Sequence, residues 1–323
     1  MSGPAVLSLL ADHALRLEAD PALLPLLRRW LPLLPYDESP PDPAPPGAAI
    51  RVRRGEASIP PRPEGPPLLR LGPVDAWVDG GVLELRGDGG CAGRGELEDG
   101  SVVLVAPRET EGAAAAAWDL YSMATLSAAL LLGRMGRALV HAAAVVEPGG
   151  GCLLLAGDTH AGKSTTAVNL IGAGWEFVSD DHVVLYRDPG SGAVRVEGWP
   201  RRFHLDEGWE EGEPGRRRGE IDPHERWPGR WRRTAPLAGL LFPRVEADLP
   251  TALSPLPASE ALAGLLRQSP WLLADRGAAA GVLELLTAAC RRPASALRLG
   301  RDTYRDAGRL AGVLRPAPAP PGR

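Results

Sequence analysis

The sequence is poor in several features, and each shortage excludes a class of protein. The three cysteines, Cys91, Cys152 and Cys290, lie far apart and lack the spacing of a zinc site or a disulfide framework. We therefore expect reduced, mostly buried thiols in a cytoplasmic protein. The net charge is -4 and no long block of basic residues occurs, so nucleic acid and anionic membranes are not expected partners. We find no apolar run of membrane-spanning length and no N-terminal signal pattern, and expect no membrane association.

Lysine is the rarest basic residue, because Lys163 is the only lysine among 36 Lys and Arg residues. It stands in residues 157–165, GDTHAGKST, which have the G-x-x-x-x-G-K-[ST] spacing of a phosphate-binding P-loop. A compact ammonium fits between phosphate oxygens where the broader guanidinium fork does not. The apolar run 152–156 predicts a buried strand before the loop, and residues 166–171 predict a helix after it. An ordinary glycine turn is the alternative, and this context favours the P-loop.

A P-loop holds a nucleotide through its backbone, because its glycines let several N–H groups point at the phosphates. The helix N-terminus adds a partial positive charge at the same place. Lys163 would reach the outer phosphates and the Ser164 hydroxyl would bind magnesium, so ATP and Mg²⁺ are the expected cofactors. The predicted nucleotide-binding residues are Gly157, Asp158, Thr159, His160, Ala161, Gly162, Lys163, Ser164 and Thr165.

The chain of 323 residues is long enough for about two domains. Residues 1–47 are predicted to hold two short amphipathic helices, because leucines recur at helical spacing, followed by a proline-rich linker. Short β-rich runs with glycine turns predict a small antiparallel sheet in residues 48–111. Alternating helix and strand patterns predict an α/β P-loop domain in residues 112–315, and the tail 316–323 is expected to be disordered.

Within residues 112–315 the patterns place helices, strands and one long irregular stretch. The predicted helices are 113–132, 166–171, 258–266, 270–289 and 304–314, and the predicted strands are 138–146, 152–156, 175–178, 183–186, 193–196, 237–242 and 296–299. Residues 206–235 are rich in glycine, arginine and tryptophan and show little periodicity. We expect them to be irregular, as active-site lids often are.

Two adjacent carboxylates, Asp180 and Asp181, follow the strand 175–178 soon after the predicted P-loop helix. Phosphoryl transfer needs one carboxylate to hold magnesium and a second to take the proton of the attacking hydroxyl. Neighbouring residues at the twisted end of a strand can supply both. A surface turn with two solvated carboxylates is the alternative, and the position of the pair favours a role at the phosphates.

His141 lies on the predicted strand before the P-loop strand, and by itself it is most simply a core histidine. Together with residues 142–146, the P-loop and residues 174–181, GWEFVSDD, it resembles the HPr kinase/phosphorylase family. The resemblance covers residues 115–245 and is specific across residues 138–187. It implies a fold related to phosphoenolpyruvate carboxykinase and transfer of phosphate from a nucleotide to a serine hydroxyl of a protein.

The resemblance also implies roles for the site residues. Ser164 and one aspartate would hold magnesium, the other aspartate would be the base, and His141 would pair with the carboxylates. We assign the metal to Asp180 and the base role to Asp181, although the reverse assignment is compatible with the motif. The family is often oligomeric, so a homo-oligomer is a further expectation.

The sequence departs from the family pattern in three places. Thr159 and His160 stand where a Ser-Gly pair is usual, and Glu197-Gly198 is the nearest match to the family's second signature. The N-terminal part is unlike the regulatory domain of the carrier-protein kinases. It is more similar to related kinases of peptide-modifying systems, some of which phosphorylate lasso peptides.

The long stretch 206–235 and its flanks carry arginines and tryptophans that could serve transfer or acceptor binding. One arginine could reach the γ-phosphate, although a solvated arginine is the simpler reading for any single one. The tryptophans could anchor a peptide or pack locally. These residues are Arg201, Arg202, Arg216, Arg217, Arg218, Arg230, Arg232, Arg233, Trp209, Trp227 and Trp231.

Three functions follow from these features. The first is a magnesium-dependent kinase acting on serine of a peptide or protein. The second is the same kinase acting on a small hydroxyl compound such as free serine or a sugar. The third is a nucleotide-binding regulatory module without transfer, for which an acidic pair beside the phosphates would not be required.

Overall fold

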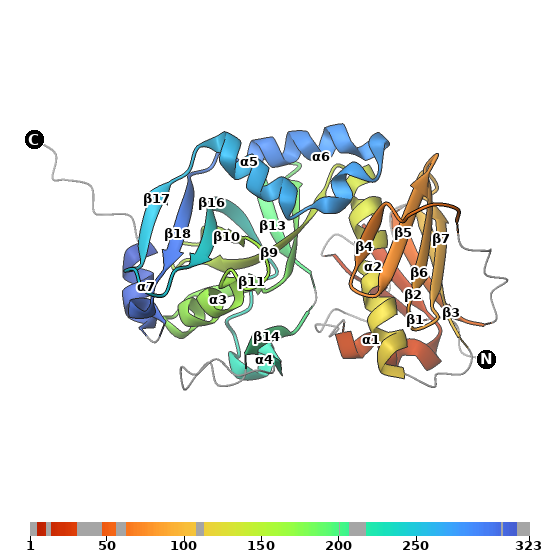
Figure 1. Cartoon of the computed structure of the whole chain (residues 1–323), viewed down its shortest axis with the longest axis horizontal. Helices are drawn as coiled ribbons and strands as arrows, with labels where there is room; N and C mark the ends of the chain where they lie inside the picture. Colours follow the sequence, from red (N-terminus) through yellow and green to blue (C-terminus); the bar gives the residue numbers. More distant parts are fainter. Residues whose placement is uncertain are drawn as a thin grey trace, which may run out of the picture.

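The computed structural model describes residues 5–10, 14–30, 47–55, 63–107, 113–199, 201–206, 218–304 and 306–314. These residues form a mixed α/β fold with two large sheets, and the long helix α2 (Ala113–Arg134) lies between them (Figure 1). On one side α2 packs on strands of the first sheet. On the other side it packs on β9 of the second sheet and on helical segments near the C-terminus.

The first sheet is mixed, whereas the sequence predicted an antiparallel one. Its described strands run in the order β1-β2-β3-β8-β7-β6-β5-β4, and the β2–β3 and β3–β8 pairs are parallel. Three of these strands, β1, β2 and β7, were not predicted. The strands are β1 Ala5–Ser8, β2 Leu15–Ala19, β3 Ala48–Arg54, β4 Leu69–Leu71, β5 Val74–Asp79, β6 Val82–Gly87, β7 Ala92–Glu96 and β8 Ser101–Ala106.

The prediction of two amphipathic helices near the N-terminus was wrong for the first of them. Residues 5–8 and 15–19 are the strands β1 and β2, and only then do the 3-10 turn η1 (Pro21–Leu23) and helix α1 (Leu24–Trp30) follow. In β2, Leu15, Leu17 and Ala19 are buried while the residues between them are half-buried. This alternation has the period of a strand, and pairing with β3 overrides the leucine spacing.

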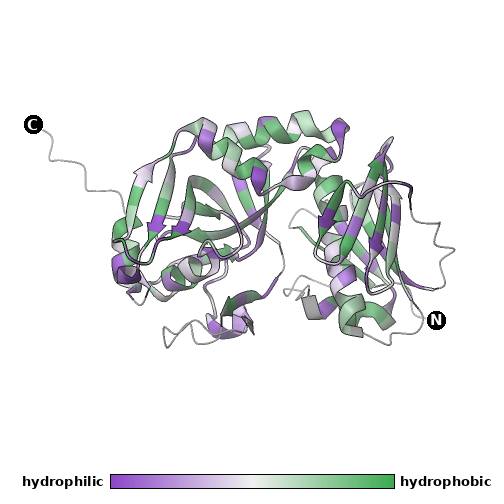
Figure 2. Cartoon of the chain, viewed as in Figure 1, coloured by the Kyte–Doolittle hydropathy of each residue, from purple (hydrophilic) through white to green (hydrophobic). Residues whose placement is uncertain are grey.

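Helix α2 confirms the predicted helix 113–132, and its residues 119–133 are all buried, as expected of a helix that lies between two layers. Figure 2 shows its hydrophobic colouring between the two sheets. By length and composition Ala114–Arg134 could cross a membrane, but 89% of its apolar window is buried inside the fold. The expectation that no apolar run reaches such a length was therefore wrong, and burial between the sheets accounts for the composition.

The second sheet carries the P-loop. Its described strands run in the order β10-β9-β12-β13-β16-β18-β17, with β11 beside β9. Because β10 also pairs with β16, the strands β10, β9, β12, β13 and β16 form a closed ring. All the strands predicted for residues 138–299 are present. They are β9 Ala138–Val146, β10 Cys152–Ala156, β11 Glu176–Ser179, β12 His182–Arg187, β13 Val194–Gly198, β16 Thr234–Val245 and β18 Ala294–Leu299, joined by the unpredicted β17 Ala252–Pro255.

The helices of this half are α3 Lys163–Gly172, α5 Ala258–Arg267, α6 Arg276–Ala289 and α7 Ala307–Leu314, with the 3-10 turns η2 Pro270–Leu273 and η3 Arg301–Thr303. The predicted helix 270–289 is therefore split in two. The Asp275 side chain accepts a hydrogen bond from the Gly277 N–H and starts α6 there.

The stretch 206–235 is less irregular than predicted. Strand β15 (Arg218–Ile221) pairs with β14 (Phe203–Asp206), and the short helix α4 (Pro223–Arg226) follows. Residues 207–217, including Trp209, Arg216 and Arg217, lie outside the described residues, as does the tail 316–323.

Candidate functional site

The predicted P-loop joins β10 to α3, in the strand, loop and helix order that its motif predicts. Lys163 is the first residue of α3, and its side chain is buried. Its Nζ donates hydrogen bonds to the carbonyl oxygens of Gly157, at 2.7 Å, and Asp158, at 3.1 Å. The ammonium is thus held by the loop that would wrap the phosphates, while residues 158–160 are exposed.

Two backbone conformations shape the loop. Gly162, the N-cap of α3, has φ 95°, and a Cβ there would stand 2.7 Å from Leu299 Cδ1. The positive φ favours glycine here, whereas the close approach is to the end of a leucine side chain that could shift. His160 has φ 65°, and it is the only residue other than glycine with a positive φ in the described part of the chain.

Asp180 lies between β11 and β12 with its carboxyl buried. Its Oδ2 accepts a hydrogen bond from the His204 backbone N–H at 3.3 Å, whereas no described residue is a hydrogen-bond partner of its Oδ1. Burial raises the pKa of Asp180, and a hydrogen bond with the Ser164 side chain opposes that rise. A buried carboxylate oxygen without a partner is unusual, and a ligand would satisfy it.

These features fit a magnesium ion held by Asp180 and Ser164. The described residues contain no group of three or more His, Cys, Asp or Glu side chains that could hold a metal by themselves. Magnesium does not need such a group, because it usually keeps several waters and binds one or two carboxylates together with substrate phosphates.

Asp181 is surrounded by three nitrogen-bearing side chains. Its Oδ1 lies 3.3 Å from His141 Nε2, and its Oδ2 lies 2.7 Å from His182 Nδ1. Arg201, three residues after the end of β13 at Gly198, donates from Nη1 to the same Oδ2. The two histidines are neighbours because β12 pairs with β9 in a register that sets His182 opposite His141.

Both histidines are uncharged at neutral pH. Burial, followed by the charge of Lys163, lowers the pKa of His141 to about 3 and the pKa of His182 to about 3. The charge of Lys163 therefore acts on both rings and disfavours their charged forms.

Gln268, at the end of α5, connects the P-loop to this group and was missed from the sequence. Its Nε2 donates to Asp158 Oδ1 at 2.9 Å, and its Oε1 lies 3.0 Å from His141 Nδ1. Its backbone carbonyl also accepts from the His141 N–H at 2.8 Å. One signal was available, because Gln268 is the only glutamine in the chain, just as Lys163 is the only lysine.

The other arginines and tryptophans of this region whose side chains the structure describes have local partners. Arg202 lies 3.6 Å from Glu220, Arg232 lies 2.7 Å from Glu176, and Arg233 lies 3.4 Å from the buried Glu197 of the possible second signature. Trp227 and Trp231 pack on a small apolar cluster that includes Phe177 and Phe203. Local packing therefore accounts for these two rings.

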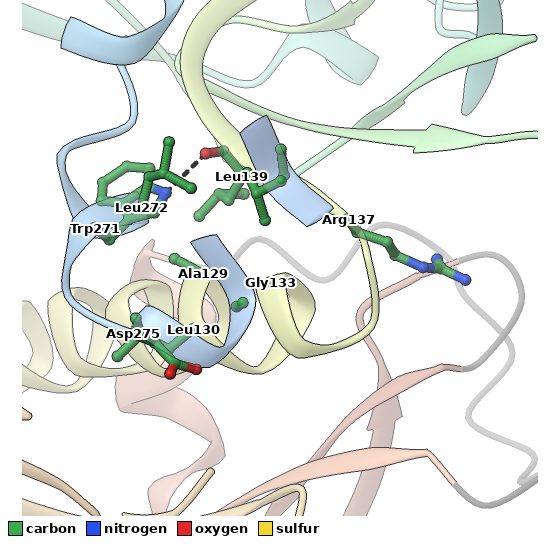
Figure 3. A pocket seen from close by; sticks show the side chains of 11 residues that line it. Ala129, Leu130, Gly133, Arg137, Leu139, Trp271, Leu272 and Asp275 are labelled. Atoms are coloured by element: carbon green, nitrogen blue, oxygen red, sulfur yellow. Dashed lines mark hydrogen bonds between the residues drawn. The ribbon is translucent and has the colours of Figure 1, made fainter. Parts of the chain in front are cut away.

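A small pocket lies between α2, the start of β9 and the η2–α6 segment. Figure 3 shows Trp271 beside Leu139, whose backbone oxygen accepts a hydrogen bond from Trp271 Nε1 at 2.8 Å. The Trp271 ring lies 5.9 Å from the ring of His182. The acidic residue of the pocket, Asp275, is bound by Arg134. The pocket thus supports the strand that carries His141 and offers no free polar group for chemistry.

No protein-family model and no curated protein sequence matches the chain. Among solved structures it is similar to the HPr(Ser) kinase/phosphatase from Coxiella burnetii, with 13% sequence identity and a TM-score of 0.32 over 55% of this chain and 87% of that chain. A likeness at this level is too weak to support an activity, so the family resemblance stays a prediction.

Proposed function

We propose that this protein is a magnesium-dependent kinase that transfers the γ-phosphate of a nucleotide, most simply ATP, to a serine hydroxyl of a peptide or protein. The observation that carries the proposal is an unbroken line of contacts from the P-loop to the acidic pair. Asp158 is linked to Gln268 at 2.9 Å, Gln268 to His141 at 3.0 Å, and His141 to Asp181 at 3.3 Å. A nucleotide in the loop would therefore end its phosphate chain beside two carboxylates.

The nucleotide side of the site has a simple division of roles. The loop's N–H groups and the α3 N-terminus would receive the phosphates, and Lys163 would turn from the loop carbonyls to the outer phosphates. Ser164 and Asp180 are the residues that would hold magnesium. When bound, magnesium neutralises charge that develops on the phosphate oxygens during transfer.

Asp181 is suited to take the proton of the acceptor hydroxyl. The Gln268 Nε2 donates to the Asp158 carboxylate, so its Oε1 faces His141. Because Oε1 can only accept a hydrogen bond, the proton of the neutral imidazole is placed on Nδ1. His141 Nε2 is then left with a lone pair that faces Asp181 Oδ1. A proton taken up by Asp181 from the hydroxyl would be shared with this nitrogen.

The substitution Asp181→Asn tests the proposal. Transfer of labelled phosphate from ATP to a pool of peptides should fall by about a hundredfold or more, because the proton acceptor is lost. Nucleotide affinity, measured in parallel, should change by less than about threefold, because the loop is intact. Asp188→Asn, in the exposed turn after β12, is the matched control and should leave both values unchanged.

Three outcomes would contradict the proposal. Undiminished transfer in Asp181→Asn would remove the proposed base. Tight nucleotide binding by the wild type with no transfer to peptides, free serine or sugars would favour a regulatory nucleotide-binding module. Transfer to a metabolite pool but not to peptides would instead assign a small hydroxyl compound as the acceptor.

A further inference from the structure

Arg201 lies against the proposed base at the oxygen that does not face His141. Asp181 Oδ1 faces His141, which is linked to Asp158 through Gln268, whereas Oδ2 receives a hydrogen bond from Arg201 Nη1. In the proposed transfer the acceptor hydroxyl must reach the Asp181 carboxylate to give up its proton. Arg201 therefore borders the place where the acceptor would lie.

The guanidinium of Arg201 is fixed in place by an aromatic ring of α2. Its Cζ lies 5.2 Å from the centre of the Tyr121 ring, and that ring stacks on Trp118 with centroids 5.4 Å apart and an interplanar angle of 15°. The side chain of Arg201 is only 12% exposed. An arginine stacked in this way and bound to a carboxylate has a defined orientation.

One donor of this fixed guanidinium is unused. Arg201 Nε is buried, and no described residue accepts a hydrogen bond from it. A buried N–H without an acceptor is costly, and guanidinium nitrogens donate but never accept. The group that satisfies Nε must therefore bring an oxygen or nitrogen lone pair to the acceptor side of Asp181.

Resting on the proposed kinase function, we propose that Arg201 orients the acceptor by donating from Nε to an oxygen of the carbonyl or carboxylate group next to the reacting hydroxyl. In serine such an oxygen lies four bonds from the hydroxyl oxygen, along Oγ–Cβ–Cα–C–O, as a peptide carbonyl or a free carboxylate. Arg201 is a specificity-determining residue in this role, and α2 contributes to acceptor recognition through Tyr121.

Matched pairs of small acceptors test this assignment. N-acetyl-L-serinamide and N-acetylethanolamine differ in the carbonyl group that follows the hydroxyl-bearing unit, and L-serine and ethanolamine differ in the carboxylate. Binding of each probe at millimolar concentration is measured by calorimetry with Mg²⁺ and a non-hydrolysable ATP analogue. The KM and kcat of transfer from ATP are measured separately. The first pair reports a peptide carbonyl and the second a free carboxylate.

In the wild type, at least one serine-type probe should bind about tenfold or more tightly than its partner, because a charged buried hydrogen bond is made only to the former. Arg201→Lys keeps the charge but loses Nε, so this preference should disappear, with an acceptor KM raised about tenfold and nucleotide affinity within about twofold. Arg202→Lys is the matched control and should retain the preference, because Arg202 faces Glu220.

Tyr121, whose ring lies against the Arg201 guanidinium, gives an independent test. Tyr121→Phe keeps the ring beneath Arg201 and should retain the preference, whereas Tyr121→Leu should weaken it. Equal binding within both pairs in the wild type, no binding of either serine-type probe, or a preference that survives in Arg201→Lys would overturn the assignment. Selective binding without transfer would refute the kinase proposal and leave the role of Arg201 standing. Transfer to the probes without selectivity within either pair would overturn the role of Arg201 and leave the kinase proposal standing.

Discussion

The two sides of the candidate site are built in different ways. The proposed phosphate side is one continuous segment, residues 157–165, in which the loop's own carbonyls hold Lys163. The proposed acceptor side is assembled from four separate segments. His141 comes from β9, Asp181 from the β11–β12 turn, Arg201 from the segment after β13, and Gln268 from the end of α5.

The difference shows how each side depends on the rest of the fold. The phosphate side needs only a strand, a glycine-containing turn and a helix, so its geometry is a local property. The acceptor side needs the β9–β12 register, which sets His182 opposite His141, and the position of α5 relative to the P-loop. Substitutions on the two sides should therefore separate nucleotide binding from transfer.

The largest expected effect is on the phosphate side. Lys163→Met removes the only ammonium of the loop, so nucleotide affinity and transfer should fall together, with transfer reduced about a hundredfold or more. Lys163→Arg should fail similarly, because the broader fork does not fit between the loop and the phosphates. Titration with a fluorescent ATP analogue and a transfer assay measure the two quantities. Full nucleotide affinity in Lys163→Met would contradict the P-loop role.

The same contrast explains what the sequence could predict. The strand, loop and helix of the P-loop follow from contiguous residues, and the position of Asp180 and Asp181 at a strand end was also correct. The contacts of Gln268 and Arg201 could not be predicted, because each joins residues that are distant in sequence. In the first sheet, β2 was mistaken for a helix because its leucines fit both periods until its pairing with β3 is known.

The next effect concerns the buried histidines of the acceptor side. An unfolded histidine has a pKa of about 6.5, whereas the pKa of folded His182 is about 3. At a pH between these two pKa values the unfolded state binds more protons than the folded state. The contribution of His182 to stability is therefore full above the unfolded pKa and is lost as the pH falls toward the folded pKa. Each such histidine contributes a slope of about 1.4 kcal/mol per pH unit in that window.

Urea unfolding at about pH 7.5 and about pH 5 measures this slope. The wild type should lose more stability on acidification than His182→Gln, although the variant is less stable at both pH values. The raised pKa of Asp180 acts in the opposite sense, favouring the folded state at low pH. It is common to both proteins and cancels in their difference. Equal slopes would show that His182 is not buried in neutral form.

A smaller effect is expected at the link between the two sides. Gln268→Leu removes the hydrogen bonds to Asp158 and His141, so kcat should fall about tenfold while nucleotide affinity changes less than about threefold. Asn169→Leu is the matched control. The Asn169 amide, further along α3, donates to the backbone carbonyl of Tyr304 at 3.3 Å. Loss of this hydrogen bond should leave kcat unchanged. A parallel loss of nucleotide affinity in Gln268→Leu would place Gln268 on the phosphate side.

The smallest effect tests whether the phosphate side stores backbone strain of its own. His160 has φ 65°, a conformation that costs a residue with a side chain about 1–2 kcal/mol. Glycine avoids that cost but loses about 0.5–1 kcal/mol through the freedom of the unfolded chain, so His160→Gly should stabilise the protein by about 0.5 kcal/mol. Thr159→Gly, at a neighbouring position without a positive φ, should only destabilise it. Urea unfolding measures the stability of the two variants. If His160 is held in a strained conformation, removing its side chain must release that strain. Equal destabilisation of both variants would therefore show that His160 is not strained in the folded protein.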